Sequence, residues 1–282
     1  MKTADNVEQI RDIVRFWRKE GLTIGFVPTM GYLHEGHQSL IRRAASENDR
    51  IVVSVFVNKM QFGPAEDFAS YPRDFQRDCE KCQEAGADLV FHPTDEEMYQ
   101  PDFSSFVDMT GLTEGLCGRS RPIHFRGVCT VVTKLFHIVS PDRAYFGQKD
   151  AQQLAVITRM ARDLNMGIEI VGCPIVREAD GLAKSSRNTY LNEEERKAAL
   201  ILSRSLTEAR QKIEAGERSV SVIETYIKER IAEEKLARLD YASVVSWPDL
   251  KEKEVIDGPV LTAIAVYIGK TRLIDNFIIS EV

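Results

Sequence analysis

The sequence is poor in several features that would assign it to a class of protein. No apolar run in its 282 residues approaches the ~18 needed to span a membrane. Residues 1–6 are polar, so we expect neither a membrane span nor a signal peptide. The formal net charge of -6 lacks the basic excess typical of nucleic-acid-binding proteins, so we expect no nucleic-acid partner.

Cysteine is also scarce. The five cysteines are odd in number and scattered, which argues against a disulfide framework and indicates free thiols in the cytoplasm. Cys79 and Cys82 form a C-x-x-C pattern without the second pair that a zinc site needs, and we interpret them as ordinary helix residues.

A composition of 43% hydrophobic and 28% charged residues is that of a globular protein with a core. Short apolar runs alternate with helix-period segments up to residue 171. The expected strands are residues 22–27, 51–57, 88–91, 143–146 and 168–171. The expected helices are residues 7–17, 37–47, 75–85, 126–139 and 150–165. This alternation predicts an α/β fold with a parallel sheet and helices on both faces.

The pattern changes after residue 172. A polar stretch, 174–191, precedes two charged amphipathic helices at 192–215 and 219–234. Three β-rich runs follow at 241–246, 260–268 and 272–279. We therefore predict a first domain of residues 1–174 and a smaller α+β domain of residues 175–282, with a ligand site in the joining loops.

The segment PTMGYLHEGH (residues 28–37) follows a predicted strand and opens a predicted helix, the place where open α/β sheets bind ligands. Backbone N–H groups at a helix start favour anions, and Gly31 and Gly36 let a ligand approach the main chain closely. His34 and His37 are three residues apart, so both rings can point at one phosphate. The H-E-G-H spacing disfavours a zinc helix, which needs H-E-x-x-H. Two structural histidines in a turn are the alternative.

Two more segments carry residue types suited to phosphate. In GQKD (residues 147–150), Lys149 can place its charge on a phosphate, and Asp150 either binds a ribose hydroxyl or caps the next helix. The segment DGLAKSSRN (residues 180–188) combines two cations with two hydroxyls, which favours a mobile phosphate clamp over a charged interdomain loop.

Neutral amides suit a small hydroxylated substrate. Asn58 and Gln61 follow the second predicted strand, and Gln153 lies one turn beyond Lys149. Arg121, near a predicted helix start, is well placed for a carboxylate. Ordinary loop structure is the alternative for each of these segments.

Together these motifs resemble the pantothenate synthetase (pantoate–β-alanine ligase) family. The resemblance covers most of the chain and is densest over residues 28–73 and 121–191; the last hundred residues match more weakly. The stretches that carry it are PTMGYLHEGH, QFGPAEDFASYPR, SRPIHFRGV, PDRAYFGQKDAQQL and PIVREADGLAKSSRN. The family belongs to the nucleotidyl transferases with a His-x-Gly-His signature on a Rossmann-like sheet.

The resemblance implies a two-step reaction. Pantoate attacks the α-phosphate of ATP, with Mg²⁺ bound, to give pantoyl-adenylate and pyrophosphate. The amine of β-alanine then displaces AMP to give pantothenate. It also implies a C-terminal lid domain and a homodimer. The nearest alternative is a nucleotidyl transferase that moves AMP onto a phosphate ester. A tRNA-charging enzyme and a non-catalytic nucleotide-binding regulator are more distant alternatives.

Residue by residue, the resemblance implies His37 as proton donor, with His34, Lys149 and Arg187 as the other catalytic residues. The implied ATP-binding residues are Met30, Gly31, Tyr32, Leu33, His34, Glu35, Gly36, His37, Gly147, Gln148, Lys149, Asp150, Val176, Lys184, Ser185, Ser186 and Arg187. The implied substrate-binding residues are Gln61, Gln153, Asn58 and Arg121. Asp78 is the implied metal ligand.

Three positions depart from the family's usual pattern. Lys59 replaces proline, Gln148 replaces glutamate and Lys184 replaces methionine. A second cation at position 184 is compatible with phosphate binding, and Gln148 can contact ATP through its backbone. Lys59 is expected to change pantoate affinity and not the type of reaction.

Overall fold

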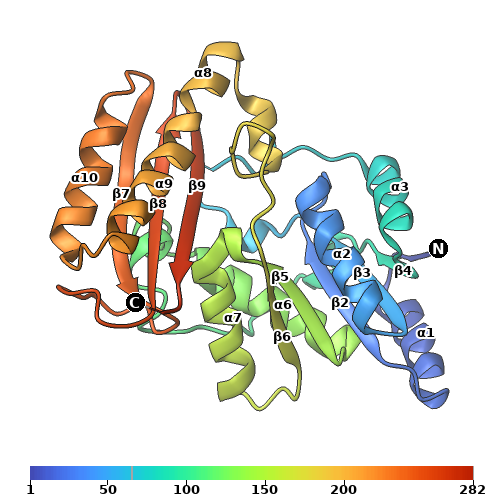
Figure 1. The fold of residues 1–282 in the computed structure, drawn as a ribbon. Coiled ribbons are helices and arrows are strands. Elements are labelled where there is room, and N and C mark those ends of the chain that lie inside the picture. The colour runs from blue at the N-terminus through green and yellow to red at the C-terminus, as the bar shows by residue number, and fades with distance from the viewer. Residues whose placement is uncertain (65, 282) are drawn as a thin grey trace. The chain divides into compact units, whose positions relative to one another are not determined.

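The computed structural model describes residues 1–64 and 66–281, and these fall into two compact units (Figure 1). The first unit comprises Met1–Thr110, Arg121–Gln148 and Val156–Pro174. The second comprises Gly111–Ser120, Lys149–Ala155 and Ile175–Val282. A single boundary at residue 174 would assign the two short segments of the second unit to the first. Within the described residues, no helix has the length and apolar character required to cross a membrane.

The first unit contains a six-stranded parallel sheet in the order β1-β4-β3-β2-β5-β6. Its strands are β1 (Lys2–Ala4), β2 (Ile24–Thr29), β3 (Arg50–Val55), β4 (Leu89–Phe91), β5 (Arg143–Gly147) and β6 (Glu169–Cys173). The chain runs outward from β2 through β3 to β4 on one side and from β5 to β6 on the other. The strand order therefore reverses between β2 and β5, and ligands bind open α/β sheets outside the carboxyl ends at such a point.

Helices cover both faces of this sheet. Its helices are α1 (Val7–Lys19), α2 (Glu35–Glu47), α3 (Phe75–Ala85), α4 (Asp95–Met98), α6 (His124–Val139) and most of α7 (Ala151–Asp163). Val27 on β2 belongs to one buried cluster with Ile41 of α2 and Cys82 of α3. The preceding Phe26 meets Phe136 of α6 edge to face, with ring centroids 6.3 Å apart. Because neighbouring strand residues point to opposite faces, α2 and α3 lie on one side and α6 on the other.

The second unit holds a three-stranded antiparallel sheet in the order β7-β8-β9. Its strands are β7 (Ala237–Ser246), β8 (Val260–Ile268) and β9 (Thr271–Ile279). Its helical segments are α5 (Leu116–Ser120), η2 (Gln148–Asp150, which spans the boundary), η3 (Ser186–Tyr190), α8 (Glu193–Ala198), α9 (Leu200–Glu214) and α10 (Val220–Ala232).

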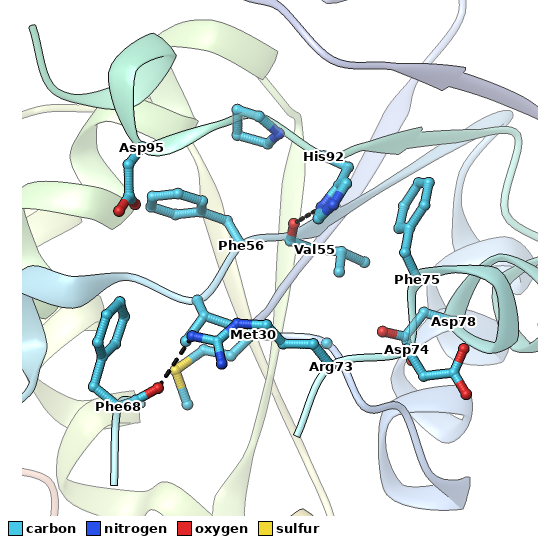
Figure 2. Close-up of a pocket in the computed structure, with 13 residues that line it drawn as sticks. Met30, Val55, Phe56, Phe68, Arg73, Asp74, Phe75, Asp78, His92 and Asp95 are labelled. Carbon is cyan, nitrogen blue, oxygen red and sulfur yellow. Dashed lines mark hydrogen bonds between the residues drawn. The ribbon is translucent and has the colours of Figure 1, made fainter. Parts of the chain in front are cut away.

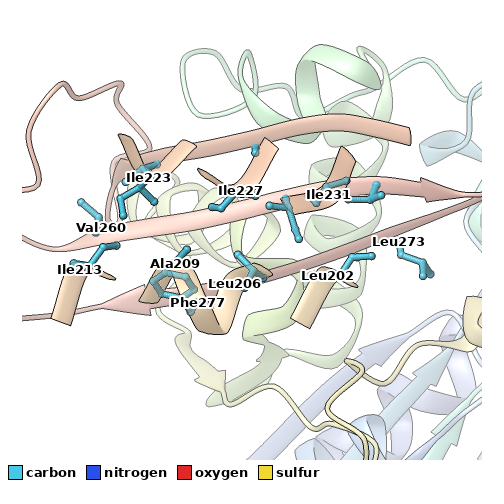
Figure 3. Packing of buried hydrophobic residues seen from close by; sticks show 14 of the residues in the cluster. Leu202, Leu206, Ala209, Ile213, Ile223, Ile227, Ile231, Val260, Leu273 and Phe277 are labelled. Carbon is cyan, nitrogen blue, oxygen red and sulfur yellow. The ribbon is translucent and has the colours of Figure 1, made fainter. Parts of the chain in front are cut away.

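Apolar residues at helical spacing build the core of the second unit (Figure 3). From α9 come Leu202, Leu206, Ala209 and Ile213, and from α10 Ile223, Ile227 and Ile231. They pack against Val260 of β8 and Leu273 and Phe277 of β9. The i, i+4, i+7 and i+11 repeat in α9 and the i, i+4 and i+8 repeat in α10 place each set on one helix face, which the sheet covers.

The predicted fold class is confirmed: a parallel sheet with helices on both faces is joined to a smaller α+β unit. The helix predicted over residues 192–215 divides into α8 and α9 at Ala199, where the backbone stays right-handed (φ -59°, ψ -20°). β1, α4 and α5 were not predicted, because segments of three to five residues are too short to show a periodic pattern of apolar residues.

Candidate active site

The loop from β2 to α2, residues 30–37, is called here the histidine loop. Gly31 has φ +84°, a left-handed conformation that favours glycine. A Cβ atom at this position would lie 2.9 Å from Asp78 Oδ2 and 3.0 Å from a methyl of Val55. The loop therefore turns here only because residue 31 has no side chain.

The two histidines of this loop are brought together by the start of α2. The Gly36 N–H donates to His34 Nδ1 at 3.1 Å, and the His34 N–H donates to His37 Nδ1 at 3.3 Å. The ring centroids are 4.1 Å apart. Because both Nδ1 atoms accept hydrogen bonds, each neutral ring carries its proton on Nε2. The pair can thus present two Nε2 donors to an anion.

Asp78 on α3 anchors the histidine loop. Its Oδ2 accepts the Tyr32 N–H at 2.8 Å, and its Oδ1 accepts the Leu33 N–H at 2.6 Å. The carboxylate is buried, and this burial raises its pKa against the opposing effect of the two hydrogen bonds. Each oxygen thus accepts one hydrogen bond from the backbone of the loop.

The implied role of Asp78 as a metal ligand stays a prediction, because each carboxylate oxygen has a second lone pair beside the hydrogen bond that it accepts. Among residues 1–64 and 66–281, no group of three or more His, Cys, Asp or Glu side chains could hold a metal ion. We interpret Asp78 as a support for the loop.

Asn58 fixes the orientation of Gln61. Its Nδ2 donates to Gln61 Oε1 and to the Gly127 carbonyl, both at 3.1 Å. Its Oδ1 accepts the Tyr99 hydroxyl at 2.6 Å. These partners use both amide hydrogens and the carbonyl, so we interpret Asn58 as a support for Gln61, and its contact with a substrate stays a prediction. Gln61 Nε2 lies 3.1 Å from Met30 Sδ, which places the two residues side by side.

Arg121 already has a carboxylate partner within the chain. Its Nε and Nη2 donate to the two oxygens of Glu66 at 2.9 and 2.5 Å, and Nη2 also reaches the Gln61 carbonyl at 3.3 Å. Burial opposes ionisation of Glu66, but the hydrogen bonds and charge of Arg121 outweigh it and lower the pKa of Glu66. A substrate carboxylate would have to compete with Glu66 for this guanidinium.

A cavity of about 240 Å³ opens beside Met30 and Gly31 (Figure 2). His92 lines it, stacked on Phe75 with ring centroids 4.0 Å apart and with Nδ1 2.7 Å from the Val55 carbonyl. Arg73 lines it too, donating to the Phe68 carbonyl at 3.1 Å. Sequence reasoning missed both residues. His92 directly follows β4, so the rule that selected the loops after β2 and β3 applies to it as well.

Lys59, the departure expected to alter pantoate affinity, lies near this cavity. Its Nζ is 3.6 Å from Oδ2 of Asp95, a cavity-lining residue, and its side chain is 45% exposed. Lys59 is the first residue of η1 (Lys59–Gln61), the short helix that also carries Gln61.

The segment at residues 147–150 begins at the end of β5. Since β5 pairs in parallel with β2, Gly147 and the histidine loop follow carboxyl ends on the same edge of the sheet. Gly147 and Gln148 belong to the first unit, whereas Lys149, Asp150 and Gln153 belong to the second. The side chain of Asp150 is half exposed, with Oδ2 3.8 Å from Lys149 Nζ.

The remaining predicted phosphate-binding residues lie in one loop of the second unit. The Lys184 N–H donates to the Val176 carbonyl at 2.9 Å, so these two residues are neighbours. Ser185 caps η3 by accepting the Arg187 N–H at 3.3 Å. The predicted clamp thus begins a short helix and is not an irregular linker.

A parallel sheet with glycine turns at its carboxyl edge is typical of α/β proteins that bind a nucleotide at the reversal of strand order, and the histidine pair adds hydrogen-bond donors for an anion there. Comparison with known families makes the assignment specific. The family model described as pantoate-beta-alanine ligase matches residues 2–278. The chain belongs to the pantoate-β-alanine ligase family, which confirms the resemblance and identifies the protein as a ligase.

Individual relatives agree with this assignment. Pantothenate synthetase of Ruminiclostridium cellulolyticum is 58% identical over 277 residues, covering 98% of each chain. That of Enterococcus faecalis is 60% identical over 271 residues, covering 96% of each. The crystal structure of pantothenate synthetase from Thermus thermophilus has a TM-score of 0.92 at 45% identity, covering 98% of this chain and 99% of that one.

A further solved relative is described with ligands. The pantoate-β-alanine ligase of Francisella tularensis, complexed with beta-gamma ATP and β-alanine, has a TM-score of 0.79 at 34% identity. The similarity covers 98% of this chain and 97% of that chain.

Proposed function

We propose that the protein is an ATP-dependent ligase that condenses pantoate with β-alanine to pantothenate through a pantoyl-adenylate. The family match over residues 2–278 carries this proposal. The Francisella relative, whose structure is described with beta-gamma ATP and β-alanine, supports the choice of ATP and β-alanine as substrates.

In the first step, a pantoate carboxylate oxygen attacks the α-phosphorus of ATP. The bond to the bridging oxygen breaks, and pyrophosphate leaves with its electron pair. The Nε2–H groups of His34 and His37 are suited to donate to the phosphate oxygens on which charge grows, with His37 as the proton donor. Gln61, oriented by Asn58, offers its amide to pantoate.

In the second step, the β-alanine amine attacks the acyl carbon of the adenylate. The acyl–oxygen bond breaks, AMP leaves, and the amine loses a proton to give the amide. Binding both substrates in line contributes roughly 7–11 kcal/mol to such a reaction. We assign this positioning to Gln61 and, in the second unit, to Gln153.

The cations of the second unit offset the repulsion between a carboxylate and a triphosphate. We assign this role to Lys149, Lys184 and Arg187, with support from the hydroxyls of Ser185 and Ser186. The backbone of Gly147, Gln148 and Val176 and the side chain of Asp150 complete the proposed ATP contacts. We further propose that residues 1–174 carry most of the ATP and pantoate contacts and that residues 175–282 act as a lid.

Magnesium is proposed to enter bound to the phosphates of ATP, because the described residues offer it no ligand set of their own. A homodimer in the cytoplasm is also proposed. All five cysteines are free thiols, which agrees with a reducing compartment.

The test is pyrophosphate release from ATP with pantoate, with and without β-alanine, while AMP and pantothenate are followed. We expect pantoate alone to give a burst of about one pyrophosphate per site and β-alanine to start steady turnover. Release triggered by a phosphate ester and not by pantoate would favour the nucleotidyl transferase and overturn the ligase.

A further inference from the structure

Two segments assigned above to the ATP phosphates are held by consecutive residues of β9. Asp275 binds Arg177 in a fork, with Nη1 to Oδ2 at 2.7 Å and Nη2 to Oδ1 at 2.9 Å. Asn276 Nδ2 donates to the Lys149 carbonyl at 2.8 Å. Both strand residues are buried, with 2% and 3% of their surface exposed. One strand therefore touches two segments that are far apart in the sequence.

Arg177 belongs to a tight arch, residues 176–184, that leads into the Lys184–Arg187 segment. The arch is a two-stranded turn: the Lys184 N–H bonds to the Val176 carbonyl at 2.9 Å and the Glu178 N–H bonds to the Leu182 carbonyl at 2.8 Å. Arg177 Nη1 also donates to the Gly181 carbonyl at the tip, at 3.0 Å. Asp275 thus holds the arch through the guanidinium of Arg177.

The side chains of Asp275 and Asn276 lie on opposite faces of β9. Leu273, Phe277 and Ile279 point into the cluster covered by α9 and α10, so Asp275 shares that face by the period of two. Asn276 faces the other way, toward Lys149. The Asn276 N–H donates to Asp275 Oδ1 at 2.8 Å, which helps to fix the aspartate side chain.

A buried ion pair is a poor way to gain stability, because desolvation of the charges offsets most of their attraction. The side chain of Asp275 is 1% exposed and that of Arg177 34%. The pair instead fixes the direction of the Arg177 side chain, because a forked guanidinium–carboxylate contact has one geometry. One triphosphate can meet cations from two segments only if their spacing is set in advance.

We propose that Asp275 and Asn276 are positioning residues for the adenylation step. Asp275, through Arg177, sets the Lys184–Arg187 segment, and Asn276 sets the backbone of Lys149. The proposal rests on the proposed function, in which these two segments bind ATP phosphates.

The test compares Asp275→Asn and Asn276→Ala with a matched control in the full-length protein. The control is Asp240→Asn, because Asp240 forms a similar half-buried pair on the same sheet, with Arg272 Nη2 at 2.7 Å. We expect Asp275→Asn and Asn276→Ala to lower kcat/KM for ATP in pantoate-dependent pyrophosphate release by roughly 10- to 100-fold. The KM for β-alanine should stay at the wild-type value, and the control should change neither.

Thermal unfolding of every variant distinguishes a displaced phosphate-binding segment from a loss of the folded structure. If Asp275→Asn does not fold, Asn276→Ala still decides the case, since it removes one amide and no charge. Equal kinetic losses in Asp240→Asn and in the two β9 variants, at equal loss of stability, would overturn the proposal.

A double-mutant cycle adds a measured coupling that a purely structural role of Asp275 would leave unchanged. Arg187→Ala and Asp275→Asn should combine to less than the product of their separate effects, because Asp275 acts through the segment that carries Arg187. Independent, multiplicative losses would contradict this. If wild type releases no pyrophosphate with pantoate, the proposed function fails. ATP affinity, measured by calorimetry on the same variants, then still tests the positioning.

Discussion

The histidine loop of the first unit and the 176–187 loop of the second are each held by one buried aspartate, but by different chemistry. Asp78 accepts two backbone N–H groups directly, whereas Asp275 binds the side chain of Arg177. The first aspartate is hydrogen-bonded by backbone N–H groups, and its burial raises its pKa. The second is met by a full opposite charge. The first loop should therefore respond to protonation and the second to loss of its cation.

The loops also differ in what they offer a substrate. The histidine loop presents two rings locked by the start of α2, with Nε2 as the proton-bearing atom. The other loop presents Lys184 and Arg187, whose charges lie at the ends of long side chains. Losing a ring should therefore affect the chemical step, whereas removing Arg177 should also lower stability because it leaves the buried Asp275 carboxylate unpaired.

The largest expected effect is on the rate. His37→Ala should lower pantoate-dependent pyrophosphate release by roughly 10²- to 10⁴-fold, the range typical of a lost proton donor, and leave the fold intact. Stopped-flow kinetics measure the rate of pyrophosphate release, and circular dichroism measures whether the fold is intact. The control is His137→Ala, at an exposed position of α6. Wild-type rates in a folded His37→Ala protein would remove His37 from the mechanism.

Next, Arg177→Met should leave the Asp275 carboxylate buried without its charge partner. Breaking a buried pair costs about 3–5 kcal/mol, and we expect about 3 kcal/mol because Arg177 is 34% exposed. Urea unfolding measures the free energy. The double variant Arg177→Met with Asp275→Leu should recover most of the loss, since no charge then remains buried. If Arg177→Met alone costs nothing, the ion pair does not hold the arch.

Asp78→Asn should cost about 1–3 kcal/mol, because the amide group turns one acceptor into a donor and leaves a buried N–H of Tyr32 or Leu33 unpaired. Chemical unfolding measures it, with Asp74→Asn as the control at the exposed N-cap of the same helix. A neutral result at position 78 would mean that the loop keeps its shape without this anchor.

The same position predicts a pH dependence. The pKa of Asp78 is raised in the folded protein above its ordinary 3.8, so the folded state binds the proton more tightly than the unfolded chain. The pH-dependent part of the stability that Asp78 contributes, separate from its two hydrogen bonds, is therefore full below 3.8 and is lost as pH rises through the raised pKa. The unfolding free energy of wild type minus that of Asp78→Asn should fall with rising pH. A rise would contradict the sign of the shift.

The smallest effect is expected at the tip of the arch, where Asp180 and Arg196 pair at 2.9 Å with side chains 44% and 27% exposed. Solvent screens such a pair, so Asp180→Asn should change the free energy of unfolding by less than about 1 kcal/mol. A loss as large as that of Arg177→Met would show that the arch is held from its tip and not from β9.

Much of the architecture was predictable because it depends on local periods. Alternating apolar runs and helix-period segments predicted the parallel sheet, and β8 was predicted over its observed span, Val260–Ile268. The i, i+4 repeat in α9 and α10 likewise follows from the chain itself. The three-residue β1 did not, since a short strand forms only when β4 is there to pair with it.

The features of the site likewise divide into those that the sequence predicted and those that only the tertiary structure shows. The types and order of its residues, from PTMGYLHEGH to KSSRN, follow from the sequence alone, and they were enough to indicate the family. The tertiary structure decided what these residues touch: Asp78 reaches a loop 45 residues away, Asn276 a carbonyl 127 residues away, and Arg121 is taken by Glu66. Sequence periods report only which side of an element faces the core. A hydrogen bond between distant segments forms when packing brings them together, and no local pattern encodes that.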